Sequence, residues 1–531
     1  MTSSMKRFLC FAALAMVIMA SSACKSKLPV TPDAPESYAR LLEKYKAEMG
    51  YIALAQSGSA TEITFYDETT LRITDMAVDD CTKKDPKVVA TSAKGEWMVG
   101  GEPTGIYRSE NSLLSKAYPI YTYFTSTELI VKLDNGNAFR LLKVAPKSAV
   151  LPTIKITTKG GAQIVSKDNY VEGTIEIDNP EHMYSDQDGF KATASFKGRG
   201  NSTWGMPKKP YRIKLAEKSE MLGMNASKNW ALLADYADKT LLRNVVAMEL
   251  SRMCEFPWTP SMRKVEVQLN GKYMGVYTLA EHKEVSKNKV NINTDKGDIY
   301  FEIEQNQDEP RCWWTDHGIP MMFSDPSEPS DEVFQQEVQF FKDFEEALWN
   351  KEFQKVYDQY IDRKTFIDNY IVQELTKNID GNLRKSTFLT KKKGEKLVMY
   401  HLWDFDLTMG NADYYDDGNK GPTGWWVKDR SYSGKNHGWY YRLFMDPEFV
   451  KAVKARWNEL YPHFQTIPQF IEENALMLND AQARNFKIWS ITDMDWWNRS
   501  HKVQSYQGEI EYFIDFYNRR LEWLNTNINN L

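Results

Sequence analysis

This 531-residue chain has only five cysteines and seven histidines. The seven histidines include no His-Glu-x-x-His motif, so the commonest catalytic-zinc signature is absent. The cysteines lack the paired spacing of a disulfide framework or a zinc site. Three cysteines follow the leader, and one disulfide bond among them is possible. These three are Cys81, Cys254 and Cys312.

Positive charge is not in excess. The chain has 67 Lys and Arg against 72 Asp and Glu, for a net charge of -5, and this balance gives no long-range attraction to nucleic acid. We therefore expect no nucleic-acid partner. The composition, with 42% hydrophobic and 26% charged residues, is that of a globular protein, and the length allows two to four domains.

Long hydrophobic runs are absent beyond the leader, where no segment approaches about 18 consecutive apolar residues. The leader has a positive region at Lys6 and Arg7, followed by an apolar run, Phe8–Ala20, that is too short to span a bilayer as a helix. The small residue before Cys24 resembles a bacterial lipoprotein box, although Ser21 stands where Leu is usual. An ordinary secretory signal is the alternative.

On the lipoprotein interpretation, residues 1–23 are a signal peptide and Cys24 carries the lipid that anchors the chain to a membrane of the bacterial cell envelope, outside the cytoplasm. Residues 24–37 contain three prolines and predict an extended tether. Residues 38–148 predict a short helix, Tyr38–Met49, and then a small β-rich module with strands at Ile63–Tyr66 and Leu129–Leu133. Residues 151–531 predict a larger α+β domain that is helical from about residue 460.

The elements expected in the larger domain follow from hydrophobic periodicity and turn signals. Asn270-Gly271 between two alternating runs is the strongest hairpin signal in the chain. The predicted strands are Thr153–Thr158, Tyr170–Ile177, Thr193–Lys197, Tyr211–Leu215, Lys264–Leu269, Met274–Ala280, Ser386–Thr390 and Lys396–Trp403. The predicted helices are Lys239–Met253, Glu332–Trp349 and Thr365–Asn378.

Two acidic loops flank the predicted hairpin between residues 386 and 403. Asp380 follows the helix that precedes it, and Asp404 and Asp406 follow its second strand. Because a hairpin returns the chain to its starting point, these carboxylates can meet at one site, as in phosphoryl-transfer enzymes that place one carboxylate on the acceptor hydroxyl and another on Mg²⁺. Ordinary helix-end and turn roles explain the same spacing.

A glycine-rich segment between two predicted strands carries Arg199, Asn201 and Ser202. Backbone N–H groups at glycines can approach an anion closely, and a guanidinium adds charge and paired donors, so this loop is a candidate phosphate site. Lys214 lies on the following strand, where it can serve as a phosphate lysine or as a solvated one. Glu281, at the end of a later hairpin, can face a nucleotide or form a surface ion pair.

These segments resemble the motifs of the spore-coat-protein-H-like (CotH) kinases over roughly residues 151–531. The matching pieces, in chain order, are Phe196–Trp204, Lys208–Leu215, Leu242–Asn244, Asn270–Tyr277, Asn378–Gly381 and Trp403–Asn411. The resemblance implies an atypical protein-kinase-like fold that binds ATP with Mg²⁺ or Mn²⁺ and phosphorylates Ser or Thr of secreted or surface proteins.

The resemblance also implies roles for individual residues. Lys214 corresponds to the lysine that pairs the phosphates, Asp380 to the aspartate at the acceptor hydroxyl, Asp404 to the metal aspartate, and Asp406 to a second metal ligand. Lys385 stands where a protein-kinase catalytic loop carries Asn.

The competing hypothesis is a non-catalytic surface protein with a degenerate kinase fold that binds a glycan or a protein partner. Its basis is a set of tryptophans among polar residues, since aromatic rings stack on sugar faces and fill partner interfaces. These are Trp313, Trp314, Trp425, Trp426, Trp439, Trp496 and Trp497. The two hypotheses differ in whether Asp380 and Asp404 must converge.

Overall fold

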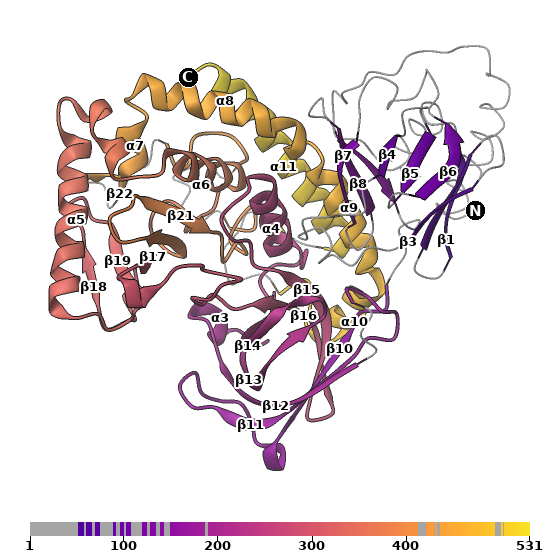
Figure 1. The fold of residues 1–531 in the computed structure, drawn as a ribbon. Coiled ribbons are helices and arrows are strands. Elements are labelled where there is room, and N and C mark those ends of the chain that lie inside the picture. The colour runs from indigo at the N-terminus through magenta and orange to yellow at the C-terminus, as the bar shows by residue number, and fades with distance from the viewer. Residues whose placement is uncertain are drawn as a thin grey trace. The chain divides into compact units, whose positions relative to one another are not determined.

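The computed structural model divides the chain into two compact units, residues Met1–Val144 and Ala145–Leu531 (Figure 1). It describes the backbone of strands between residues 51 and 142, and then residues 149–185, 189–412, 421–428, 431–432, 436–493, 501–502 and 504–531. The predicted leader, the lipidation position Cys24, the tether, the helix at 38–49 and Cys81 lie outside the described residues.

The described strands of the first unit form three antiparallel sheets of three strands each. The predicted strands at 63–66 and 129–133 correspond to β2 and β8. The first sheet contains β1 (Tyr51–Ser57), β2 (Ala60–Phe65) and β3 (Thr70–Thr74). The second contains β4 (Val89–Thr91), β5 (Glu96–Val99) and β6 (Glu102–Tyr107), and the third contains β7 (Pro119–Phe124), β8 (Glu128–Leu133) and β9 (Ala138–Leu142).

The second unit begins with a closed barrel, drawn in magenta in Figure 1, whose strand order is β10-β11-β12-β13-β14-β16-β15. Parallel pairing of Ile154 with Val267 joins the first strand to β15 and closes the barrel. The strands are β10 (Thr153–Thr158), β11 (Val171–Asp178), β12 (Gly189–Gly198), β13 (Tyr211–Met221), β14 (Met224–Leu233), β15 (Met262–Leu269) and β16 (Lys272–Glu281). The short elements η3 (Lys159–Gly161) and α3 (Ser202–Gly205) lie in its connections.

Alternation along the strands sets which side chains fill the barrel. In β13, Tyr211, Ile213 and Leu215 are buried in its core, whereas Arg212 and Lys214 point to the outside. At the β15–β16 hairpin, Asn270 and Gly271 have φ values of 49° and 78°, as a two-residue turn of the primed type requires. The predicted Asn-Gly turn is therefore confirmed.

The rest of the unit contains a five-stranded sheet of order β18-β19-β17-β20-β21. Its strands are β17 (Ile299–Ile303), β18 (Cys312–Trp314), β19 (Pro320–Asp325), β20 (Thr387–Lys391) and β21 (Leu397–His401). The helices are α4 (Arg243–Met253), α5 (Asp331–Trp349), α6 (Arg363–Thr376), α7 (Trp439–Leu443), α8 (Pro447–Phe464), α9 (Ile467–Met477), α10 (Asn479–Ile488) and α11 (Tyr506–Asn529). The minor elements are η4 (Thr294–Lys296), η5 (Phe353–Lys355), η6 (Tyr357–Gln359), β22 (Ser431–Tyr432) and β23 (Asn436–His437).

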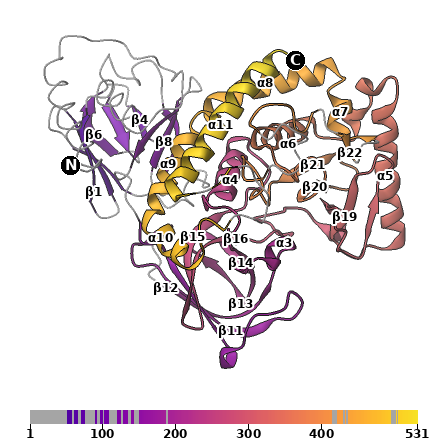
Figure 2. The same cartoon turned by 180° about the vertical axis from the view of Figure 1, so that it is seen from behind.

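Local signals define where several of these helices begin. Ser330 and Asp362 accept hydrogen bonds at the first turns of α5 and α6, and Ser505 does so at α11, so each satisfies a backbone N–H that the helix itself leaves unpaired. Helices α6, α8 and α11 pack against one another, and α4 contacts both α6 and α8 (Figure 2). The helical part starts before residue 460, because α8 already begins at Pro447.

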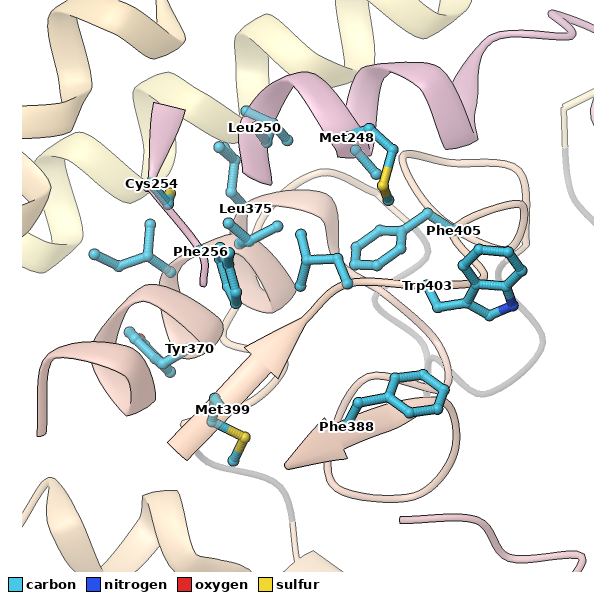
Figure 3. Packing of buried hydrophobic residues seen from close by; sticks show 14 of the residues in the cluster. Met248, Leu250, Cys254, Phe256, Tyr370, Leu375, Phe388, Met399, Trp403 and Phe405 are labelled. Carbon is cyan, nitrogen blue, oxygen red and sulfur yellow. The ribbon is translucent and has the colours of Figure 1, made fainter. Parts of the chain in front are cut away.

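One hydrophobic core joins α4, α6 and the β20–β21 hairpin. Figure 3 shows Trp403 and Phe405 at the edge of the cluster that contains Met248 and Leu375. This burial fixes the segment that directly follows β21, since moving Phe405 out of the core would expose a fully buried aromatic side chain. Mixed α and β content agrees with the predicted α+β class.

Among the described residues, no helix combines the length and apolar character needed to cross a membrane. Cys254 and Cys312 form no disulfide, and Cys254 is buried.

Candidate active site

The two predicted acidic loops meet at the same end of the β20–β21 hairpin. Ser386, just before β20, has its hydroxyl 3.4 Å from Oδ2 of Asp404, which follows β21. Asp380 lies on the same loop as Ser386, where Lys385 N–H donates to its carbonyl. Burial raises the pKa of Asp380, and the negative charge of Asp404 acts in the same direction. The two carboxyl groups therefore interact, although they are 24 residues apart in the chain.

Asp406 joins this pair from the other side of Phe405. Burial raises the pKa of Asp406 well above its usual range, and the neighbouring carboxylates Asp404 and Asp380 act in the same direction. Asp404 is exposed, whereas Asp406 and Asp380 are half-buried. Asp404 adopts a left-handed backbone with φ of 68°, which is uncommon outside glycine. The result is a cluster of three carboxyl groups.

Arg199 supplies positive charge to this cluster. Burial lowers the pKa of the Arg199 guanidinium, while Asp404 and Asp406 oppose that effect. The guanidinium carbon also lies 5.9 Å from the centre of the Trp403 ring, within the range of a cation–π contact. Folding therefore brings the predicted Arg199 beside the predicted Asp404 and Asp406.

A second arginine lies beside the first. Nη1 of Arg212, on β13, is in hydrogen-bonding contact with Nε2 of His282, which follows β16. Burial lowers the pKa of Arg212, and Arg199 adds to this by like-charge repulsion. Burial and the same two arginines hold the pKa of His282 well below its usual range, so the imidazole is neutral at pH 7.

Helix α4 holds the acidic segment in place from its first turn. Oδ1 of Asn244 accepts a 2.8 Å hydrogen bond from the N–H of Phe405. The neighbouring Arg243 donates from Nε to the Thr408 carbonyl at 3.1 Å. Because both groups are buried, these bonds fix the backbone on either side of Asp406.

Arg243 is itself held by two buried carboxylates. Its Nη1 lies 2.5 Å from Oδ1 of Asp238 and 3.1 Å from Oε1 of Glu509 on α11. Removing one partner of such a buried pair leaves an uncompensated charge, so the arrangement is strongly constrained. It connects the C-terminal helix to the acidic segment.

The glycine-rich loop does not offer its first N–H groups to an anion. Gly198 N–H donates to the Ser166 carbonyl at 2.7 Å, and Arg199 N–H donates to the Pro210 carbonyl at 3.3 Å. A Cβ at Gly198 would lie 2.5 Å from the Trp204 ring, so this glycine is required for packing. These two N–H groups are therefore already paired within the protein.

Asn201 and Ser202 are both exposed on this loop. Asn201 accepts a 3.4 Å hydrogen bond from Lys167, and Ser202 begins the short helix α3. Lys214 is exposed on the outer face of the barrel, with its ammonium 5.9 Å from the centre of the Tyr170 ring. Within the described part of the chain, no ion pair joins Lys214 to the three aspartates.

The structure does not agree with the prediction that Glu281 faces a nucleotide. Its side chain is completely buried, and its carboxylate accepts hydrogen bonds from Ser261 N–H at 2.9 Å and from Asn225 Nδ2 at 3.3 Å. A buried carboxylate with these partners ties β16 to its neighbours, and a ribose cannot reach it without breaking them.

Of the five described tryptophans proposed as a sugar platform, two are buried in the core and two others pack against it. Trp426 and Trp439 are buried, and Trp313 packs against Phe323 and Phe334. Buried rings cannot stack on a sugar, so these positions do not form such a platform. Trp314 is exposed and Trp425 is half-buried, while Trp496 and Trp497 lie outside the described residues.

The three aspartates offer oxygen donors to a divalent metal. Within the described ranges, no group of three or more His, Cys, Asp or Glu side chains lies close enough to hold an ion by itself. The donor chemistry does fit Mg²⁺ or Mn²⁺, because the carboxylates of Asp404 and Asp406 supply the hard oxygen donors that these ions prefer. Mg²⁺ commonly binds through one or two carboxylates and completes its shell with water and substrate phosphates.

Sequence reasoning did not assign roles to Asn244, Arg243, Arg212 and His282. The first two were part of a quoted motif, and the alternation of β13 placed Arg212 on the same face as Lys214. His282 carried no signal, because its contact with Arg212 joins strands that are 70 residues apart.

Comparison with protein families agrees with this arrangement. No curated protein matches the chain at a significant level. A family model described as CotH kinase protein matches residues 196–524, a range that includes the glycine-rich loop, all three aspartates and most of the C-terminal helices. Since this match spans more than half of the sequence, the chain belongs to the CotH kinase family.

Proposed function

We propose that this protein is a lipid-anchored, extracytoplasmic atypical kinase that transfers the γ-phosphoryl group of ATP to Ser or Thr of secreted or surface proteins. The observation that carries the proposal is the meeting of Asp380, Asp404 and Asp406 with Arg199, from loops that are far apart in the sequence. Family membership supports a kinase-like protein. The barrel followed by a largely helical part supports a kinase-like division into two lobes.

In the proposed reaction, the acceptor hydroxyl oxygen attacks the γ-phosphorus of ATP, its proton passes to a carboxylate oxygen of Asp380, and ADP leaves. The raised pKa of Asp380 suits proton acceptance, because a more basic carboxylate accepts a proton more readily. Arg199 offsets phosphate charge. Asp404 and Asp406 would hold Mg²⁺ or Mn²⁺, which when bound neutralises charge on the phosphates.

The neighbouring groups prepare the site for these roles. Asn244 and Arg243 hold the backbone around Asp406. The carboxylates are therefore positioned before the substrate binds, and binding does not have to order this segment. Lys385 attracts Asp380 and opposes the rise in its pKa, which favours the ionised form that accepts a proton. The first unit, with its described β-strands, is proposed as a spacer between the membrane and the kinase-like part.

The test is phosphate transfer from γ-labelled ATP by the purified full-length protein in detergent, with Mg²⁺ or Mn²⁺. We expect label on the protein or on a Ser/Thr-containing substrate, and a loss of roughly 100-fold or more in Asp380→Asn and Asp404→Asn. Asp295→Asn is the matched control, because Asp295 is an exposed aspartate outside the site. Absence of both label and metal-dependent nucleotide binding in the unmodified protein would leave the chain as a non-catalytic scaffold.

A further inference from the structure

Arg212 and Arg199 form a pair of adjacent positive charges. Like-charge repulsion from Arg199 contributes to lowering the pKa of Arg212. Within the described residues, neither guanidinium forms an ion pair with a carboxylate. Asp404 and Asp406 attract Arg199, and Glu284 attracts Arg212.

The hydrogen bonding of Arg212 is incomplete. Nη1 contacts Nε2 of the neutral His282, but the buried Nε has no hydrogen-bond partner. A buried donor without a partner is destabilising, and it is more so on a charged group. In native proteins such a group is commonly completed by water or by an ion, and the charged partner that matches a guanidinium is an anion.

Position on β13 distinguishes Arg212 from Lys214. Both point out of the barrel, but Arg212 pairs with Lys197 next to the loop that carries Arg199, whereas Lys214 pairs with Ser195 two residues further away. Along β13, Arg212 therefore lies two residues nearer than Lys214 to the loop that carries Arg199.

We propose that Arg212, held by His282 and acting with Arg199, binds the terminal phosphates of the nucleoside triphosphate, in place of Lys214. This inference rests on the proposed function and identifies a residue that binds the phosphates of the substrate. A guanidinium presents paired donors that match phosphate oxygens, which a lysine cannot do. The contact with the imidazole leaves Nε and Nη2 of the fork available for the anion.

The test is calorimetric binding of ATP and of inorganic tripolyphosphate to the full-length protein with Mg²⁺. We expect Arg212→Gln to weaken both ligands roughly 10- to 100-fold, and Lys214→Gln to change them less than about threefold. Lys218→Gln is the matched control, because Lys218 is an exposed cation on the same strand and outside the site. Arg212→Lys keeps the charge and loses the paired donors, so we expect an intermediate affinity.

Each outcome decides between the two proposals. Unchanged ligand affinity in a folded Arg212→Gln or Arg212→Lys protein overturns this inference. A loss of affinity that is larger in Lys214→Gln than in Arg212→Gln also overturns it. Neither result contradicts the proposed function. Tripolyphosphate binding that depends on Arg212, without any ATP binding, supports the anion site and overturns the kinase proposal. Binding of neither ligand by the unmodified protein overturns both. Circular dichroism establishes that each variant is folded.

Discussion

Glu304 gives a stability prediction whose sign and size follow from the structure. It directly follows β17 and is only 6% exposed, and its Oε1 accepts a hydrogen bond from Asn306 N–H at 2.9 Å. Burial is the main cause that raises the pKa of Glu304 from 4.5 to about 7, and Glu302 adds to the rise while Lys385 opposes it. Folding therefore favours the protonated carboxyl.

The direction of the pH effect follows from proton linkage. Below about pH 4.5, Glu304 is protonated in both the folded and the unfolded chain, so it has no effect on stability. As the pH rises from 4.5 to about 7, the unfolded chain releases the proton first and the folded state loses stability, and above about 7 this cost is constant. At about 1.4 kcal/mol for each pH unit, the upper limit of this cost is about 3.5 kcal/mol, and screening by water reduces it to about 1–3 kcal/mol.

We therefore expect Glu304→Gln, which keeps the shape and stays neutral, to unfold at the same urea concentration as the unmodified protein at pH 4.5. At pH 8 it should be more stable by about 1–3 kcal/mol. Unfolding is followed by tryptophan fluorescence. Glu395→Gln, at an exposed position in the β20–β21 turn, is the control and should behave alike at both pH values. An equal effect of Glu304→Gln at pH 4.5 and pH 8, or a loss of stability at pH 8, would refute the reasoning.

Two further predictions concern the acidic segment and the membrane anchor. Asn244→Ala leaves the buried N–H of Phe405 without an acceptor. We therefore expect the free energy of unfolding, measured by urea titration, to fall by about 1–3 kcal/mol, and ATP binding to weaken. A change below about 0.5 kcal/mol in the free energy of unfolding would contradict this role. If Cys24 carries the lipid, radiolabelled palmitate should be incorporated into the unmodified chain and not into Cys24→Ala, and label that persists in the variant would favour an ordinary secretory signal.

The predictions that succeeded depended on signals within a few neighbouring residues. Period-two alternation and turn signals predicted every barrel strand except β14, and the Asn270-Gly271 turn has the backbone that its two residue types favour. The hairpin between residues 386 and 403 brought Asp380 and Asp404 to one end because a hairpin must return the chain to its start. Each of these signals is local, so the sequence alone was enough to read it.

Residues whose environment depends on distant elements could not be assigned in this way. Glu281 looked like an exposed hairpin end, but its carboxylate is buried against Ser261 once β15 and β16 join the barrel. Arg212 and Lys214 are equivalent by alternation, and only the approach of His282 and Arg199 separates them. Periodicity tells which face of a strand a side chain occupies, but the partner on that face is set by tertiary packing.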